Sequence, residues 1–306
     1  MIVDSAKPTL VIFADGCPLS NLAAKGWCAR HDVPFLVLVH CVFEGWSRDY
    51  AGYLSELEKS YKAAREVIAV SAENLQLLRR CFGLRDDHGR VIYNGRPARY
   101  FAQPDAAQRL RLREELGLPA DSILCLSVGR MELVKGFQYQ LEALRRLAEN
   151  SCWPALYFLW VGTGTRQRRL VGLAKWVAGD KIIHFEQRDD IPDLMTAADM
   201  LVHCPCYEGM PLVVLEAMAS ALPIVATGVS GIPEALADTG LLLSSPDTAT
   251  DLAGEIADAV SSLAQDDTLR LRLGQAAQRR AHALFREDLM LQRYRDLLVQ
   301  MMVDIQ

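Results

Sequence analysis

The sequence predicts a doubly wound α/β fold, in which helices cover both faces of parallel β-sheets. Short apolar runs recur along almost the whole chain. Most of these runs do not alternate polar with apolar residues, which is typical of strands that are buried on both faces. Longer amphipathic stretches separate the runs, and this alternation of strand with helix is the pattern of α/β proteins.

The individual elements follow from these runs in chain order. We expect strands at residues 9–14, 35–39, 67–70, 91–93, 123–128, 156–161, 181–185, 200–203, 223–226 and 240–243. We expect helices at residues 108–115, 137–149, 166–178, 211–221, 247–264 and 267–283. A last helix over 285–304 has an apolar face made of Leu289, Leu291, Tyr294, Leu297, Leu298 and Met301.

The series of strands divides where Asn94-Gly95 predicts a turn and several prolines follow. The sequence therefore predicts four segments. These are a partial Rossmann-like lobe over residues 1–100, a linker over 101–120, a second Rossmann-like lobe over 121–284 and a final helix over 285–306. The first lobe has only four strands, fewer than a complete lobe of the dinucleotide-binding type.

Composition excludes several classes of protein. The chain has 306 residues, of which 51% are hydrophobic, and this apolar content excludes a disordered protein. A formal net charge of −5 argues against nucleic acid as a partner. Prolines interrupt the least charged stretch, residues 211–233, so we expect no membrane-spanning helix.

The eight cysteines are too sparse for a disulfide scaffold. We expect them to be buried, reduced thiols. Cys204 and Cys206 are close in sequence, but no second pair or suitably spaced histidine completes a zinc site. The sequence has no signal-peptide pattern, so we expect a cytoplasmic protein.

Polar residues follow the strand expected at 123–128, at the edge of the sheet where α/β proteins bind ligands. Arg130 and Lys135, between Gly129 and Gly136, are suited to hold an anion, although a solvated surface pair is the alternative.

Two further strand ends carry weaker signals. The Gly162-Thr163-Gly164 sequence predicts either a phosphate loop or only a tight turn. Asp189 or Asp190 is expected to cap a helix that begins at Ile191.

The stretch 207–218 is the most informative part of the chain. Pro211 fits the first turn of a helix, and the amides of Leu212 and Val213 would form an anion site there. Glu208 precedes this helix and Glu216 lies in its second turn. A carboxylate beside an anion site suits the hydroxyl groups of a sugar, and a ribose diol would satisfy Glu216. The alternative is a capping Glu208 with a salt-bridged Glu216.

Residues 123–245 resemble the donor-binding lobe of the family-4 retaining glycosyltransferases, which have the two-lobed GT-B fold. The resemblance rests on the loop 129–136, on the two glutamates eight residues apart at 208 and 216, and on residues 228–234, which occur in the family's order. It continues through residues 70–71 and 91–95 and into the last helix, which in this fold crosses back onto the first lobe. A GT-B fold with an incomplete first lobe is implied.

The resemblance also implies a set of site residues and a nucleotide-sugar donor, for which we expect a UDP- or GDP-sugar. Cations would hold the diphosphate, Glu208 and backbone amides the donor sugar, and Glu216 the ribose. The loop around Arg188 would line the base pocket. The implied catalytic residues are Glu208, Lys135, Arg130 and His40. The implied donor-binding residues are Glu216, Gly209, Met210, Leu212, Val213, Arg188 and Gly129.

This sequence departs from the family's pattern in two places. Pro211 stands where the family often has glycine, so one backbone donor is lost. The chain also starts at what resembles the fourth strand of the acceptor lobe. We therefore expect either a partner chain that completes this lobe or a truncated or reduced enzyme, for which loss of activity is one outcome.

The implied reaction transfers a sugar, with retained anomeric configuration, to a hydroxyl of a glycan or lipid-linked acceptor. Because no Asp-x-Asp motif occurs, we expect a metal-independent enzyme without a cofactor. The resemblance implies a role in polysaccharide or glycolipid synthesis. The alternatives are a non-catalytic sugar-nucleotide-binding subunit and an epimerase. The epimerase would need acid/base groups such as His31, His40, Glu44 or Asp49. Cations at 59, 62 and 65 could reach an inner membrane surface, but acidic residues in the same stretch make an ordinary solvated face the better explanation.

Overall fold

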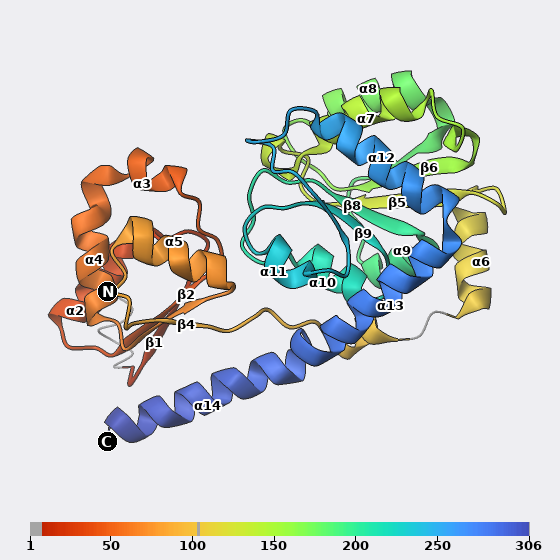
Figure 1. Ribbon diagram of the computed structural model, residues 1–306. Coiled ribbons are helices and arrows are strands. Elements are labelled where there is room, and N and C mark those ends of the chain that lie inside the picture. Colours follow the sequence, from red (N-terminus) through yellow and green to blue (C-terminus); the bar gives the residue numbers. More distant parts are fainter. Residues whose placement is uncertain (1–7, 103–104, 306) are drawn as a thin grey trace. The chain divides into compact units, whose positions relative to one another are not determined.

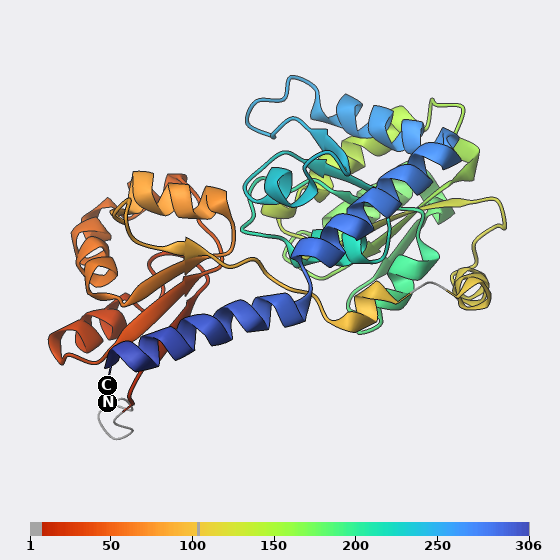
Figure 2. The ribbon, with the colours of Figure 1, turned by 60° about the horizontal axis from the view of Figure 1, so that its bottom comes forward.

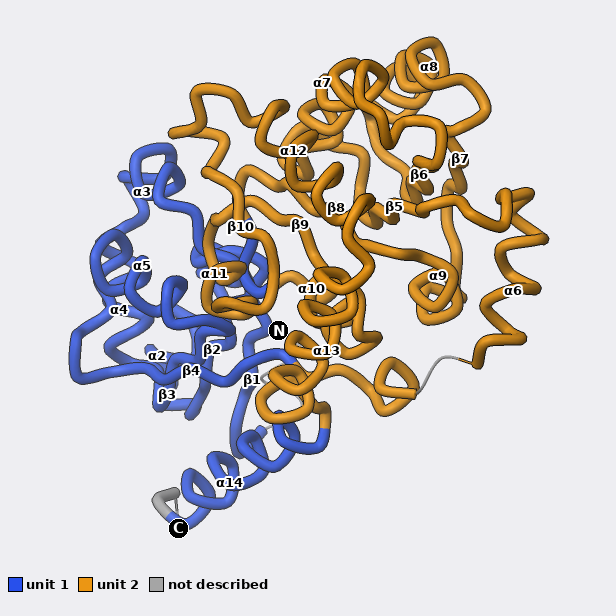
Figure 3. Tube along the Cα trace, turned by 45° about the vertical axis from the view of Figure 1, so that its right-hand side comes forward, with its two compact units in different colours: residues 1–94, 208–210, 288–306 blue, residues 95–207, 211–287 orange. Residues whose placement is uncertain are grey.

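The computed structural model describes residues 8–102 and 105–305, and the chain divides into two compact units (Figure 3). Unit 1 comprises Met1–Asn94, Glu208–Met210 and Asp288–Gln306. Unit 2 comprises Gly95–Tyr207 and Pro211–Glu287. Each unit is built on its own parallel sheet, and its elements are labelled in Figure 1.

Unit 1 contains a four-stranded parallel sheet in the order β1-β2-β3-β4. Its strands are β1 (Val11–Asp15), β2 (Phe35–Val39), β3 (Glu66–Ala69) and β4 (Arg90–Val91). Its helices are α2 (Leu22–Arg30), α3 (Gly45–Asp49), α4 (Leu54–Ala63), α5 (Ala72–Phe82) and α14 (Glu287–Ile305). The first residue of α14, Glu287, belongs to unit 2.

Alternate residues of the buried strands in unit 1 face two separate cores. Val37 and Val67 point into a core formed with Leu57 of α4 and Leu78 of α5. Leu36, Ile68 and Ile92 point to the other face, where they pack against Leu297 and Met301 of α14. Figure 2 shows α14 lying along this second face. The apolar face expected on the last helix is therefore used against the sheet of unit 1.

Unit 2 contains a six-stranded parallel sheet in the order β10-β9-β8-β5-β6-β7. Its strands are β5 (Ile123–Val128), β6 (Leu156–Val161), β7 (Ile182–Phe185), β8 (Met200–His203), β9 (Ile224–Thr227) and β10 (Leu241–Leu243). Its helices are α6 (Ala106–Glu115), α7 (Phe137–Leu147), α8 (Gln167–Ala178), α9 (Ile191–Ala197), α10 (Leu212–Ala219), α11 (Ile232–Leu236), α12 (Leu252–Gln265) and α13 (Asp267–Leu284). The strand order reverses between β5 and β8.

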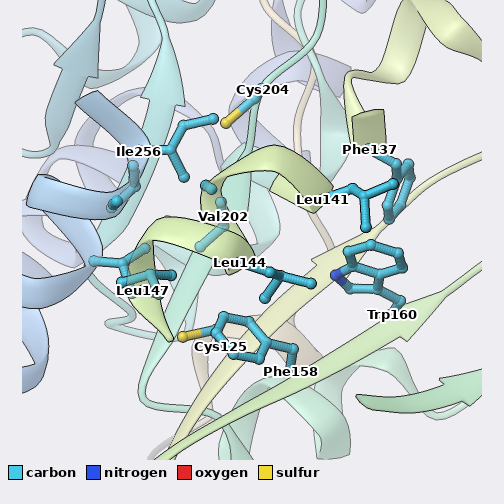
Figure 4. Close-up of a cluster of buried hydrophobic side chains, with 14 of the residues drawn as sticks. Cys125, Phe137, Leu141, Leu144, Leu147, Phe158, Trp160, Val202, Cys204 and Ile256 are labelled. Atoms are coloured by element: carbon cyan, nitrogen blue, oxygen red, sulfur yellow. The ribbon is translucent and has the colours of Figure 1, made fainter. Parts of the chain in front are cut away.

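Aromatic and aliphatic side chains fill the core between this sheet and the helices α7 and α12 (Figure 4). Trp160 of β6 is fully buried and meets Phe137 of α7 edge to face, with ring centroids 5.3 Å apart. Ile256 contributes from α12 and Val202 from β8. The doubly wound prediction is confirmed, because both sheets are parallel and every expected strand overlaps an observed one.

The helix expected at residues 108–115, within the stretch expected as a linker, is confirmed and lies in unit 2. Residues 106–115 form this helix, α6, which packs against α9. Arg109 and Arg113 of α6 both form ion pairs with Asp199, at 2.5 and 3.0 Å. The charged run is therefore an anchored helix, because its cations have a partner that lies far away in the sequence.

The cysteines and the helices bear on two further expectations. All eight cysteines are free, but only Cys28, Cys125 and Cys204 are buried, so the expectation of uniformly buried thiols was wrong for the other five.

No helix in the described part of the chain combines the length and the apolar character needed to cross a bilayer.

The Asp199 carboxylate connects α6 to strand β5 in unit 2, and its removal should destabilise the unit. It also accepts a hydrogen bond from the Leu124 amide at 2.8 Å. Asp199→Ala would leave the buried Arg113 guanidinium without a counter-charge, which lowers the free energy of unfolding by about 3–5 kcal/mol. Urea unfolding followed by tryptophan fluorescence measures the change, with Asp180→Ala at an exposed site as the control. Equal unfolding midpoints for the two variants would contradict this role.

Candidate functional site

The switch point of the unit 2 sheet marks the candidate site. Strands β5, β6 and β7 lie to one side of it and β8, β9 and β10 to the other. Ligands of doubly wound proteins bind beyond the carboxyl ends of the strands at this point. The loop 129–136 follows β5, and the chain that leads into α10 follows β8. The topology therefore brings Arg130 and Lys135 to the same edge as the start of α10.

Glycines let the loops at this edge pack directly on one another. Gly136 has φ +76°, and a Cβ there would lie 1.7 Å from the carbonyl oxygen of Cys204. Gly162 has φ +151°, and a Cβ there would lie 1.9 Å from the carbonyl oxygen of Gly129. Because a side chain cannot fit at either position, the loops after β5, β6 and β8 form one interlocked surface. The Gly162-Thr163-Gly164 turn is explained by this packing without a ligand.

Hydrogen bonds fix the same loops. The Met131 amide donates to Thr163 O at 2.7 Å, and the Cys206 amide donates to Val134 O at 2.8 Å. Glu132 accepts hydrogen bonds from the Thr165 amide and hydroxyl, at 2.8 and 2.6 Å, and these bonds lower the pKa of the Glu132 carboxyl. The backbone that carries the two cations is thus held rigidly.

The two cations differ in their exposure. Arg130 is exposed, whereas Lys135 is half-buried at the end of a single 3₁₀ turn, Leu133–Lys135. The aliphatic stem of Lys135 folds back towards the end of β5, since a Cβ on Gly129 would lie 4.0 Å from its Cγ and Cδ. The stem of Lys135 therefore lies beside Gly129 at the carboxyl end of β5.

The start of α10 adds a third positive element. Helix α10 begins at Leu212, one residue later than the expected start at 211. Pro211 is therefore its N-cap, and this residue makes no side-chain cap bond. The first amides to bond within the helix are those of Val214 and Leu215, both to Pro211 O. The amides of Leu212 and Val213 belong to the helix terminus, where N–H groups have no intrahelical acceptor and the helix dipole is positive.

Glu216 has an ion-pair partner that the sequence did not indicate. Its carboxylate lies 2.5 Å from the guanidinium of Arg96 and also interacts with the hydroxyl of Tyr100. Burial raises the pKa of the Glu216 carboxyl, and the nearby Arg96 partly opposes this effect. In this structure Glu216 is therefore salt-bridged, which is the alternative interpretation that the sequence offered for this residue. The only sequence signal for Arg96 was its place directly after the Asn94-Gly95 turn.

Arg188 lies after β7, at the edge of the sheet and two strands from β5. It forms a bidentate ion pair with Asp190 and stacks on Phe185 at 4.7 Å. Asp190 occupies the N-cap of α9 but makes no side-chain cap bond, so its predicted capping role was wrong. Its carboxylate binds the guanidinium instead, which lowers its pKa. The role of Arg188 in a base pocket stays a prediction.

The remaining candidate site residues, His40 and the segment Glu208–Met210, lie in unit 1. His40 ends the run of β2, and its amide donates to Asp15 O at 2.9 Å. A Cβ on Gly209 would lie 1.7 Å from His40 O, so glycine permits this close approach. The Asn94 side chain donates to Met210 O at 3.1 Å. The short segment that also contains Glu208 is therefore held in unit 1 together with His40.

A buried ion pair lies beside His40. Asp15 and Lys25 are both fully buried, with Lys25 Nζ 2.7 Å from Asp15 Oδ2. Burial raises the pKa of Asp15 and lowers that of Lys25. Lys25 also donates to Pro18 O at 3.1 Å, and Asn21 donates to Asp15 at 2.7 Å. The pair fixes the loop between β1 and α2, and sequence reasoning missed it.

No three His, Cys, Asp or Glu side chains gather as a potential metal site within residues 8–102 and 105–305.

Comparison with known proteins identifies relatives over nearly the whole chain. The family described as glycosyl transferases group 1 matches residues 108–280, and that described as glycosyltransferase family 4 matches residues 1–99. The D-inositol 3-phosphate glycosyltransferase of Xylanimonas cellulosilytica is 32% identical over 82% of this chain. The alignment covers 63% of that relative, so the chain spans less than two thirds of its length.

Solved structures share the fold of the whole chain. The sucrose-phosphate synthase of Thermosynechococcus elongatus has a TM-score of 0.80 and 26% identity, over 98% of this chain and 76% of that one. Anabaena HepE in complex with UDP has a TM-score of 0.81 and 21% identity, over 98% of this chain and 81% of that one.

The ion pair between Arg96 and Glu216 predicts a pH dependence of stability. The pKa of Glu216 in the folded chain lies above its ordinary value of 4.5, so the folded state binds more protons than the unfolded state between these two values. Stability therefore falls as the pH rises through this window. Arg96→Met removes the opposing cation, raises this pKa further and extends the loss of stability to higher pH. Urea unfolding from about pH 4 to pH 8 measures the effect, which should reach about 3–5 kcal/mol at the upper end.

The control for this experiment is the double variant Arg96→Met/Glu216→Gln. The amide has a similar shape and no titratable proton, so the additional fall with pH should disappear. A double variant that keeps the pH profile of Arg96→Met would show that another group is responsible.

Proposed function

Because the chain belongs to the group 1 glycosyltransferases, we propose that it transfers a sugar from a nucleoside diphosphate sugar to an acceptor hydroxyl. The observation that carries the proposal is the positive edge of unit 2. The proposal is supported by topology, since the loop that carries the two cations and the start of α10, where the N-cap residue makes no side-chain cap bond, both follow strands at the switch point of the unit 2 sheet. A departing diphosphate is an anion of the size and charge that such an edge can bind.

This edge supplies the stabilisation that glycosyl transfer requires. Cleavage of the anomeric bond develops negative charge on the diphosphate and oxocarbenium character on the sugar. Donors that are already fixed in place stabilise such charge most effectively, because they need no reorganisation during the reaction. The interlocked loops after β5, β6 and β8 fix the backbone that carries Arg130 and Lys135.

Glu216 is proposed to bind the ribose of the donor. A carboxylate offers about four lone-pair sites, so one that is paired with Arg96 can still accept hydrogen bonds from a diol. A UDP- or GDP-sugar is the proposed donor, supported by the UDP complex of Anabaena HepE, which shares the fold. Arg188 would lie near the base, whereas His40 and Glu208 would contact the donor sugar.

We propose retention of configuration through displacement on one face of the sugar. The acceptor oxygen bonds to the anomeric carbon as the bond to the diphosphate breaks, and the leaving phosphate takes the acceptor's proton. The protein's cations and helix terminus would take the place of a divalent metal. A glycan or lipid-linked acceptor in the cytoplasm or at its membrane surface fits this reaction, as does a role in polysaccharide or glycolipid synthesis.

Lys135→Ala tests the assignment of the diphosphate site. The loss of one charged donor should lower turnover of the donor sugar by about 10²–10³-fold and should weaken UDP or GDP binding. Calorimetry with UDP, GDP and ADP measures binding, and release of the nucleotide measures turnover. Lys175→Ala, at an exposed position of α8, is the matched control. Native affinity and turnover in Lys135→Ala would remove this lysine from the site, and binding without any turnover in the native chain would favour a non-catalytic subunit.

Removal of metal should leave the activity unchanged. Because fixed cations neutralise the diphosphate in the proposed mechanism, turnover in excess EDTA should equal turnover in buffer supplemented with Mg²⁺ or Mn²⁺. Initial rates at saturating donor measure this. An absolute requirement for either ion would reject the metal-independent mechanism and would leave the family assignment untouched.

A further inference from the structure

The carboxyl edge of the unit 1 sheet holds the backbone of His40 from two sides. Its amide donates to Asp15 O, at the end of β1, over 2.9 Å. Its carbonyl oxygen accepts a hydrogen bond from Asn74 Nδ2 of α5 at 3.4 Å. Helix α5 begins shortly after β3, and its N-cap, Ser71, accepts a hydrogen bond from the Asn74 amide at 3.1 Å. The Asn74 side chain therefore links the ends of β2 and β3.

The same side chain lies against the segment Glu208–Met210. A Cβ on Gly209 would lie 3.2 Å from Asn74 Nδ2 and 1.7 Å from His40 O. Both distances are closer than a side chain at this position could tolerate. The backbone next to Glu208 therefore packs directly on the hydrogen bond between Asn74 and His40.

Packing alone does not explain an asparagine at this position. The Asn74 side chain is fully buried, and its Oδ1 has no hydrogen-bond partner on the residues that the structure describes. A buried oxygen without a partner costs stability, whereas an apolar side chain with the same branching, such as leucine, would avoid this cost. Leucine, however, could not donate to His40 O. The position thus gives up stability and gains one specific donor.

We propose that Asn74 is a positioning residue for glycosyl transfer, which fixes His40 and the segment Glu208–Met210 relative to one another. The inference rests on the proposed function, in which His40 and Glu208 contact the donor sugar. Groups that act together on one sugar are most effective when their positions are set before the substrate binds. Asn74 acts only through the backbone of its neighbours. It should therefore affect the sugar end of the donor and leave the nucleotide end, which unit 2 is proposed to bind, unchanged.

Asn74→Leu separates positioning from packing. The variant loses the donor to His40 O together with the unpartnered oxygen, so the free energy of unfolding should stay equal or rise. The donor is the nucleotide sugar that the native chain turns over fastest among UDP- and GDP-hexoses. Its kcat/KM should fall at least about tenfold, because displaced substrate contacts are costly. The Kd for the matching nucleoside diphosphate, measured by calorimetry, should change by less than about twofold, because its proposed contacts lie in the other unit.

Two further variants complete the kinetic test. Asn74→Ala should lower kcat/KM in the same way, and it keeps the test valid if leucine does not fit. Gln76→Leu is the matched control, because it replaces a side-chain amide by leucine at an exposed position of the same helix. The control should keep the native kcat/KM.

Hydrogen exchange gives a readout that needs no turnover. Amides within residues 206–212 should exchange about two- to tenfold faster in Asn74→Leu than in the native chain, because one hydrogen bond behind this segment is lost. Amides within residues 222–228, which contain β9, should exchange at the native rate.

Native kcat/KM in both Asn74 variants would overturn the proposal. Equal losses of kcat/KM and of nucleotide affinity would also overturn it, since they would show a general disturbance. A native chain that turns over no donor, combined with faster exchange of residues 206–212 in Asn74→Leu, would contradict the proposed function instead. That result would still assign the position of this segment to Asn74.

Discussion

The contact between the loop after β5 and its two neighbouring loops is the constraint on which the candidate site depends. At Gly136 and Gly162 the backbone of one loop lies where a Cβ would overlap a carbonyl oxygen of another. Both residues also have positive φ, so rotation about the backbone offers no relief. The loop that carries Arg130 and Lys135 consequently has one packed position. The positive edge of unit 2 is therefore formed before any ligand arrives, which is the condition for strong electrostatic stabilisation.

The strands were predictable because burial on both faces leaves a plain signal in the sequence. Runs such as residues 123–128 contain almost no polar side chain and reappear as strands with nearly the same bounds. Helices with one polar face were also predictable in unit 2. No ranges were predicted for α2 to α5. In α2 the apolar pattern is interrupted by Lys25, which is buried and ion-paired although its side chain is charged.

The strand ends at which the candidate residues lie could be predicted, whereas the partners of these residues could not. Strand ends locate Arg130, Lys135 and the start of α10, because parallel strands all end at one edge. The partner of Glu216, however, lies 120 residues earlier in the chain, and nothing in the local pattern connects the two. The same holds for Asp199, whose ion pairs with Arg109 and Arg113 anchor the helix expected at residues 108–115. Such pairings depend on tertiary contacts, which a single sequence does not display.

The partner of Glu216 also resolves an electrostatic difficulty. Glu216 lies four residues after Leu212, and at 1.5 Å per residue this places it about 6 Å along the axis from the amides that would bind an anion. At this separation an unpaired carboxylate would repel each unit of negative charge by about 3 kcal/mol at an effective dielectric constant of about 20. The guanidinium of Arg96 neutralises the carboxylate without occupying all its lone pairs. A hydrogen-bond acceptor for hydroxyl groups can therefore stand beside the proposed diphosphate site, which an isolated glutamate at this position would weaken.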